Sequence, residues 1–429
     1  MLSNGLPVLS CHTPGRRLAA FHLVIHVGAS QEPEGYDGLA QIAAQSLIED
    51  GAGEWGSRVE RLGATLGVSA GLASTRIVMS VPAGRLHGAL DVLFEALSGS
   101  RVNAGNVEPL VRTQCEVVRR EGIDPRRRAK AELYAALFDP GERAARRIGG
   151  SSETLARIDV AAVEDFRRRF YGPDNATSVI ACEMPSDRLG RVLADRLGRW
   201  HAPALPYRRL NPPRAAGEPG LTIVHRPDAP QTELALGHLL PDPRHPEWAA
   251  LKVAAHVLGG GLDSRLNMKL RERKAYSYGF SAAAEPLPQA GLLFIRGSVA
   301  RARSVDAVAD ILAELSRTAE EGVRQDECQT SVDKLVRGAY TRFETTGQIA
   351  AKLARTAAGG LPDDEAGQHL LALAAQDRDT VSTALARHLS IARLAVVAVG
   401  DAHKIYAPLE QLCGRPAKLV DPEAYGTHP

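Results

Sequence analysis

Apolar and polar positions repeat in the same order in the two halves of this 429-residue chain. Each half begins with an alternating, strand-like run, followed by an apolar helix, a hairpin-like pair of strands, an amphipathic helix and a late strand. The first half has them at Ala19–Gly28, Gly38–Gly51, Leu66–Val81, Leu86–Ala96 and Ala176–Cys182. The second half has them at Thr232–Leu239, Trp248–Leu258, Tyr278–Val299, Val305–Leu315 and Leu394–Gly400. Antiparallel strands with packed helices predict an α+β domain, here duplicated.

A proline-rich segment separates the two repeats. Residues 200–220 read WHAPALPYRRLNPPRAAGEPG and carry five prolines. Such a segment can neither continue a helix nor pair well in a sheet. We therefore predict an N-terminal domain over residues 1–205, a proline-rich linker over residues 206–220 and a C-terminal domain over residues 221–429.

Composition excludes several classes of protein. The chain is 44% apolar and 24% charged, with a net charge of +2, which suits a globular protein and gives no support to a nucleic-acid or membrane partner. Its five cysteines are scattered and include no Cys-x-x-Cys pair, which argues against a disulfide framework or a thiolate zinc site. We also expect no signal peptide, no membrane span and a cytoplasmic location.

The first apolar helix carries an unusual polar pair. It reads GLAQIAAQSLIEDG, and Gln41, Ala44 and Gln45 share one face because four residues make about one helical turn. No His-x-x-Glu-His zinc motif, Gly-x-Ser-x-Gly elbow or phosphate-binding loop occurs in the chain. His22 and His26 share a strand face, but without a nearby carboxylate they are interpreted as packing residues.

The stretch over residues 258–280 offers possible chemistry. It reads LGGGLDSRLNMKLRERKAYSYGF, with a glycine run at Gly259, Gly260 and Gly261. That run either ends a helix, the ordinary interpretation, or cradles a backbone or phosphate. Arg271 lies at the end of the next helix and Tyr278 in the strand after it, so the pair can converge as donors to a carbonyl or an oxyanion. Packing of Arg over an aromatic ring and of Tyr in a core explains the same residues equally well.

Over nearly its whole length the chain resembles the pitrilysin family, which includes insulin-degrading enzymes and mitochondrial processing peptidases. The resemblance is carried by SNGLPV, HVGASQEPEGYDGLA, FYGPDNATSVI and GGGLDSRL…LRERKAYSYG. The last is the most specific, because the family has a Tyr seven residues after the Arg of Leu-Arg-Glu, as Tyr278 follows Arg271 here. The resemblance implies the LuxS/MPP-like metallohydrolase fold: two homologous α+β domains, each an antiparallel sheet with helices on one face.

The resemblance also implies a dismantled zinc site. Active members carry His-x-x-Glu-His on the first apolar helix, and those positions fall on Gln41, Ala44 and Gln45 in this chain. The family's third ligand, a downstream Glu in a Glu-x-x-x-x-Glu helix, corresponds to Glu121. One carboxylate cannot hold zinc, so we expect no metal or other cofactor in this chain.

Some bacterial members consist of two chains, of which one bears zinc and the other keeps only the Arg/Tyr pair. The present chain has the second profile. We therefore expect a non-zinc-binding subunit, inactive alone, that pairs with a zinc-bearing pitrilysin-family subunit and acts on unstructured peptides. Arg271 and Tyr278 would be catalytic in trans, and the glycine run at Gly259–Gly261 would contact substrate. Two alternatives stay open: an inert scaffold like the core subunits of the respiratory bc1 complex, and a stand-alone peptidase with another ligand set.

Overall fold

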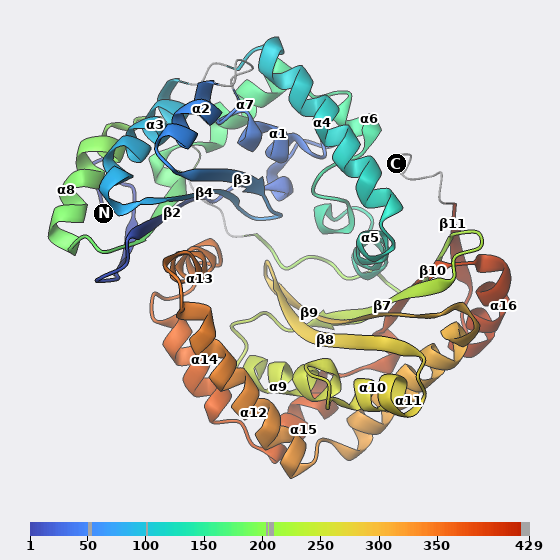
Figure 1. Ribbon diagram of the computed structural model, residues 1–429. Helices are drawn as coiled ribbons and strands as arrows, with labels where there is room; N and C mark the ends of the chain where they lie inside the picture. The colour runs from blue at the N-terminus through green and yellow to red at the C-terminus, as the bar shows by residue number, and fades with distance from the viewer. Residues whose placement is uncertain (50–53, 100–101, 203–204, 206–209, 422–429) are drawn as a thin grey trace. The chain divides into compact units, whose positions relative to one another are not determined.

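The computed structural model describes residues 1–49, 54–99, 102–202, 205 and 210–421, and within them the chain forms two compact units, each built on its own β-sheet (Figure 1). Unit 1 comprises Met1–Val118, Arg147–Arg209 and Ala339–Gly367. Unit 2 comprises Arg119–Arg146, Leu210–Gly338 and Gln368–Pro429. Residues 206–209 of the predicted linker lie outside the described residues.

The sheet of unit 1 has five strands in the order β1-β5-β2-β4-β3. The strands are β1 (Val8–His12), β2 (Leu18–Ile25), β3 (Thr65–Ala70), β4 (Thr75–Pro82) and β5 (Ala176–Cys182). The helices of this part of the chain are α1 (Leu39–Gln45), α2 (Glu54–Arg61), α3 (Leu86–Gly99), α4 (Ala104–Ile123), α6 (Ser152–Leu155), α7 (Val160–Phe170), α8 (Ser186–Arg196) and α13 (Thr346–Ala358). β5 is buried along its whole length, as expected for a strand covered on both faces.

The sheet of unit 2 has six strands in the order β11-β6-β10-β7-β9-β8. The strands are β6 (Leu221–His225), β7 (Gln231–Leu240), β8 (Ser277–Leu287), β9 (Ala290–Ala300), β10 (Ala395–Gly400) and β11 (Ala417–Val420). The accompanying helices are α5 (Pro125–Leu137), α9 (Trp248–Gly259), α10 (Arg265–Asn267), α11 (Ser304–Glu321), α12 (Gln325–Tyr340), α14 (Glu365–Ala374), α15 (Arg378–His388) and α16 (Ala402–Cys413). Leu234, Leu236 and Leu240 point from β7 into a core shared with α9, α11 and α15.

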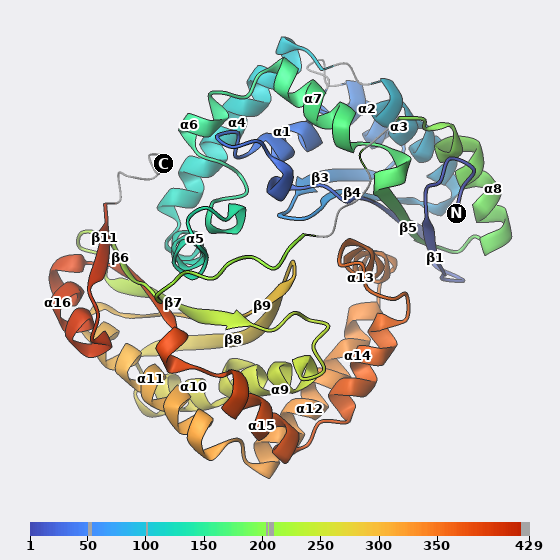
Figure 2. The same cartoon turned by 180° about the vertical axis from the view of Figure 1, so that it is seen from behind.

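Each half of the sequence contributes one helix to the sheet of the other half. α13 comes from the C-terminal half, yet it packs on β2 and β5 of unit 1 (Figure 1). α5 comes from the N-terminal half, yet it packs on β7 and β10 of unit 2 (Figure 2). The compact units therefore differ from the predicted halves, because each unit takes in a segment that the other half of the sequence encodes.

These two helices cover the sheet faces opposite the main helical layers. On β2, Ala20 and Val24 contact α13, whereas Phe21 and Leu23 point to the other face because side chains alternate along a strand. On β7, a Cβ added at Gly237 would lie 3.4 Å from Leu133 of α5. The α+β architecture with two sheets is confirmed, and the expectation of helices on only one face is corrected by α5 and α13.

The hairpins are antiparallel as predicted, but both sheets also contain parallel pairs. β1 pairs in parallel with β5, and β6 pairs in parallel with both β10 and β11. Parallel partners require a crossover connection, and here the intervening helices supply it. Among the described residues, none of the helices has the length and apolar character needed to cross a bilayer.

Candidate functional site

Helix α1, which bears the two glutamines, is short, and specific contacts fix the residue at which it begins. Gly38 adopts a left-handed conformation with φ of 101° directly before α1, and Glu32 Oε1 accepts hydrogen bonds from the backbone N–H groups of Gly38 and Ala40 at 3.1 and 2.8 Å. A carboxylate at this end satisfies free N–H groups and complements the helix dipole. α1 ends at Gln45, before the predicted end of the helix at Gly51, and Asp50 and Gly51 lie outside the described residues.

The three positions on the face of α1 have different environments. Gln41 Oε1 accepts a hydrogen bond from the backbone N–H of Ala70, in β3, at 2.9 Å. Ala44 is fully buried. Gln45 Oε1 is buried with no hydrogen-bond partner among the described residues. The Gln41 amide thus connects α1 to β3. The Gln45 amide leaves a buried acceptor unsatisfied, which lowers the stability of the folded protein.

Glu121 lies in the last turn of α4, in unit 2. Its Oε1 atom forms an ion pair with Arg127 Nη1 of α5 at 2.9 Å, and about a third of the Glu121 side chain is exposed. The described part of the structure therefore shows Glu121 joining two successive helices, and its place in an ancestral ligand set stays a prediction.

Arg271 lies in a π-helical segment, Met268–Arg273, which directly follows α10. Its Nε atom lies 3.4 Å from Glu272 Oε1, and 37% of its side chain is exposed. The helical segment closes with bonds from Ala275 N to Arg271 O and from Tyr276 N to Leu270 O, and Ala275 has a positive φ of 53°. π-helical turns are rare in proteins, and those that do occur are often found at functional sites.

Tyr278 lies in a β-bulge at the start of β8. The pairing of β8 with β9 shifts register between Ser277 and Phe280, and Tyr278 falls inside that shift. Ser277 Oγ donates to Ser298 O at 2.6 Å and accepts from Gly279 N at 3.0 Å, so the backbone on both sides of Tyr278 is fixed. The Tyr278 residue itself is 92% exposed. The core-packing alternative for this tyrosine is therefore wrong.

A buried asparagine that the sequence did not single out connects this bulge to the glycine run. Asn267 Nδ2 lies within hydrogen-bond distance of Gly261 O at 2.8 Å and Phe280 O at 2.9 Å, and Oδ1 accepts from Phe280 N at 2.8 Å. Its residue is 3% exposed. Asn267 thus joins the turn after α9 to β8, one residue beyond the bulge. A polar residue among apolar ones in SRLNMKL was the available signal.

The glycine run has a packing role in this structure. A Cβ at Gly259 would lie 2.4 Å from the backbone N of Ala282, so only glycine lets α9 approach β8 so closely. Gly261 O accepts from Ser264 Oγ at 2.5 Å as well as from Asn267. These contacts are internal to unit 2, and substrate binding by Gly259, Gly260 and Gly261 stays a prediction.

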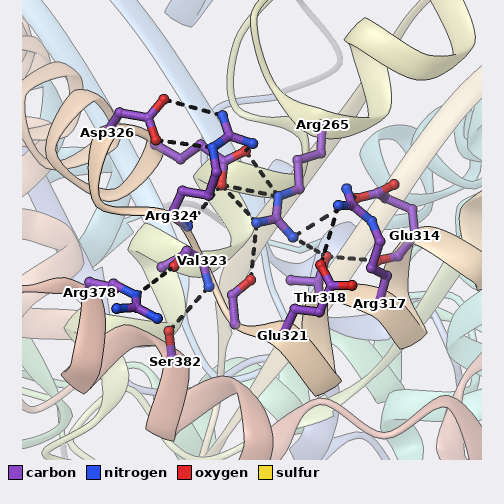
Figure 3. A network of polar contacts seen from close by, with 12 residues as sticks. Arg265, Glu314, Arg317, Thr318, Glu321, Val323, Arg324, Asp326, Arg378 and Ser382 are labelled. Carbon is purple, nitrogen blue, oxygen red and sulfur yellow. Dashed lines mark hydrogen bonds and ion pairs between the residues drawn. The ribbon is translucent and has the colours of Figure 1, made fainter.

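Arg265 anchors the same segment to the helices behind it (Figure 3). It is only 8% exposed, and its guanidinium donates to Glu327 Oε2 at 2.7 Å and to Thr318 Oγ1 at 2.9 Å. Burial by itself raises the pKa of Glu327, but the hydrogen bonds from Arg265 and the backbone of Arg324 outweigh burial and lower it. α10 is therefore fixed to α11 and α12 by a buried cation with matched partners.

His22 and His26 behave as packing residues, although β2 ends at Ile25 and so only His22 lies in the strand. His26 Nε2 lies 2.9 Å from Thr177 Oγ1, and burial lowers the pKa of His26. Burial, and then the charges of Arg76 and Arg355, lower the pKa of His22 to about 4. Both rings therefore favour the neutral form at neutral pH.

Comparisons with known proteins agree with this architecture. A family model described as the peptidase M16 inactive domain matches residues 157–335. A protein named uncharacterized zinc protease from Mycobacterium tuberculosis is 25% identical over 366 residues, covering 83% of this chain and 82% of the relative. A similarly named protein from Streptomyces coelicolor is 22% identical over 367 residues, covering 83% of this chain and 79% of the relative.

Solved structures have the same fold. The crystal structure of a peptidase M16 inactive domain from Pseudomonas fluorescens superimposes with a TM-score of 0.82 at 21% identity, covering 93% of this chain and 96% of that one. This chain is thus similar to peptidase M16 proteins in its fold and over residues 157–335, and it lacks the zinc motif. A chain of Complex III2 from Candida albicans gives a TM-score of 0.83 at 12% identity, covering 97% of this chain and 98% of that one.

At the positions that correspond to the metal ligands of the pitrilysin family, the chain does not fit a zinc ion. Zinc sites use thiolate, imidazole and carboxylate ligands, whereas Gln41 and Gln45 offer amides and Ala44 offers only a methyl group. The Gln41 oxygen is also engaged by Ala70 N. No step of a zinc mechanism can therefore be assigned to this face of α1.

Proposed function

We propose that this chain is the non-zinc-binding subunit of a heterodimeric zinc metallopeptidase that cleaves unstructured peptides. The observation that carries the proposal is Tyr278, a tyrosine almost wholly exposed on a rigid bulge, seven residues after Arg271 in a chain whose metal positions cannot hold zinc. A structural tyrosine buries its ring and pairs its hydroxyl, whereas a tyrosine that serves a partner must present both.

In the proposed complex each chain supplies different groups of the catalytic site. The partner, a zinc-bearing pitrilysin-family subunit, supplies the metal and the general base that activates water. This chain supplies the Tyr278 hydroxyl and the Arg271 guanidinium as hydrogen-bond donors to the substrate carbonyl, and the same donors stabilise the negative oxygen that develops when water attacks.

The experiment is peptide cleavage by the complex of this chain with its zinc-bearing partner. Arg271→Ala and Tyr278→Phe should each lower kcat about 100- to 1000-fold, the usual effect of removing one oxyanion donor, with co-purification unchanged. Arg273→Ala and Tyr276→Phe are matched controls from the same segment, because Arg273 is exposed and the Tyr276 ring already stacks with Lys274 and Arg303. Full activity of both test variants would refute the proposed role.

The second candidate is an inert scaffold, favoured by the likeness to a chain of Complex III2. A scaffold needs neither donor, so substitution of Arg271 or Tyr278 would leave the assembly intact and its activity unchanged. A neighbouring gene that encodes a His-x-x-Glu-His relative would favour the peptidase, since the zinc-bearing subunit must be supplied by another chain.

A further inference from the structure

Two histidines and one carboxylate converge in unit 2 at the end of α9 remote from the glycine run. His245 and Glu247 lie in the connection between β7 and α9, and His388 is the last residue of α15. One potential ligand atom from each residue lies within 4.8 Å of the others. The 12-residue helix α9, about 18 Å long, separates this cluster along the chain from Gly259.

Both imidazoles approach the same carboxylate oxygen. Glu247 Oε2 lies 2.6 Å from His388 Nε2 and 4.0 Å from His245 Nδ1. The two rings are nearly perpendicular, with centroids 5.4 Å apart and an interplanar angle of 82°. Two imidazole nitrogens and one carboxylate oxygen form a ligand set that suits Zn²⁺ and related transition metals.

A neighbouring contact orients the Glu247 carboxylate for this purpose. Arg387 Nη1 donates to Glu247 Oε1 at 2.5 Å, which leaves Oε2 facing the histidines. Metal-ligating carboxylates are commonly fixed in this way by a hydrogen bond to the other oxygen. The backbone N–H of Glu247 donates to His245 Nδ1 at 3.2 Å, so Nδ1 carries the lone pair of the ring, and metal binding at Nδ1 would replace this hydrogen bond. The Arg387 side chain is 61% exposed, so solvent screens its charge.

We propose that His245, Glu247 and His388 bind one divalent transition-metal ion of the zinc class, with water completing the coordination. Zinc–ligand bonds of about 2.0–2.2 Å place tetrahedral ligands about 3.3 Å apart, so His245 moves towards Glu247 from its present 4.0 Å and His388 moves slightly away from it. The ion would cross-link the connection before α9 to the end of α15, which are 141 residues apart in sequence. The proposal is independent of the peptidase role.

The test is a titration of the full chain, free of any affinity tag and stripped of metal, with Zn²⁺ by calorimetry and with Co²⁺ by visible absorption. One equivalent should bind. Glu247→Gln and His388→Ala should each weaken binding on the order of 100-fold, because loss of a ligand costs at least as much as loss of its supporting contact. His403→Ala is the control, since the His225–His403 ring pair lies 4.8 Å apart elsewhere in unit 2.

Thermal unfolding gives an independent readout. Saturating Zn²⁺ should raise the Tm of the wild-type chain and leave that of His388→Ala unchanged, because an ion that binds only the folded state stabilises it. Circular dichroism checks that the variants fold. Absence of metal binding by the folded wild-type chain, or undiminished binding by both folded ligand variants, would overturn the proposal, and the cluster would then be an ion pair between Glu247 and His388 alone.

Discussion

Tyr278 combines an exposed side chain with a fixed backbone. Ser277 bonds on both sides of the bulge, and Asn267 holds both backbone groups of Phe280 two residues later. Functional side chains are effective when the atoms beneath them are held in place, since little ordering remains to be done on binding. The polar contacts of Ser277 and Asn267 thus fix the backbone from which the exposed Tyr278 side chain projects.

Asn267→Ala should destabilise the protein by about 1–3 kcal/mol, because the buried backbone N–H and C=O of Phe280 lose their bonds to the Asn267 amide. Asn267→Asp should be at least as harmful, since it places a carboxylate against the carbonyl oxygens that Nδ2 now contacts. Chemical denaturation measures the effect, with the exposed Asn211→Ala as a control. An unchanged denaturation midpoint for Asn267→Ala would contradict the role assigned to this residue.

At the scale of elements, α13 determines the environment of one face of the first sheet. Ala350 and Ala354 are fully buried against Ala20 and Val24, because small side chains let the helix approach the strands closely. His22 lies between those two strand positions on the same face. Its ring is 4% exposed and close to Arg355 of α13 and Arg76 of β4, and its Nδ1 has no partner among the described residues.

The lowered pKa of His22 predicts that the folded protein loses stability in acid. Burial and the two arginines lower its pKa from 6.5 to about 4 in the folded state, so the unfolded chain binds a proton more readily between those values. The contribution of neutral His22 to the free energy of unfolding is therefore fully present above about pH 6.5. It falls as the pH drops towards 4, by about 3 kcal/mol in total. Denaturation midpoints at pH 7 and pH 4.5 measure this loss. His22→Gln should show a smaller loss than the wild type; an equal loss would assign the sensitivity to other groups.

At the scale of the whole molecule, the two compact units do not correspond to two separable halves of the sequence. Unit 1 needs α13 from the C-terminal half, and unit 2 needs α5 from the N-terminal half. A fragment ending before the linker would leave Ala20, Val24, Val179 and Ala181 of the first sheet uncovered. Exposed apolar surface of this kind promotes aggregation.

Residues 1–205 expressed alone should therefore be insoluble or poorly folded, and co-expression with residues 206–429 should recover a soluble complex. The control is the same second fragment with Ala350→Asp and Ala354→Asp, which should fail to recover it because a charge would be buried against the strands. Solubility after co-expression is the measurement. A cooperatively folded fragment 1–205 on its own would contradict the prediction.

Much of the fold could be predicted because its signals are local. β5, α9 and both hairpins follow from periodicity, and the positions of Gln41 and Arg271 within a family site follow from resemblance. The exchange of α5 and α13 could not be predicted, because an amphipathic pattern shows that a helix has an apolar face but not which sheet it covers. The bulge at Tyr278 and the clamp by Asn267 depend on tertiary hydrogen bonds. The cluster at His388 depends on the proximity of Glu247, 141 residues away in sequence, which no spacing reveals.

The proposed metal cluster changes how the absence of catalytic zinc must be tested. Zinc found in the isolated chain would not by itself indicate a working peptidase site, since His245, Glu247 and His388 would account for it. Metal analysis of the His388→Ala variant separates the two sites. A stand-alone peptidase would retain zinc and cleave peptides in that variant, whereas the proposed non-zinc subunit would do neither.

The helix exchange also sets an order of events during synthesis. The last strand of the first sheet ends at Cys182, but the helix that covers its second face runs from Thr346 to Ala358. A ribosome must therefore translate most of the second half before the first sheet is complete, although N-terminal domains of many proteins fold as soon as they emerge. The nascent first half must wait with an apolar sheet face exposed, and this interval is when a chaperone would be most useful to this chain.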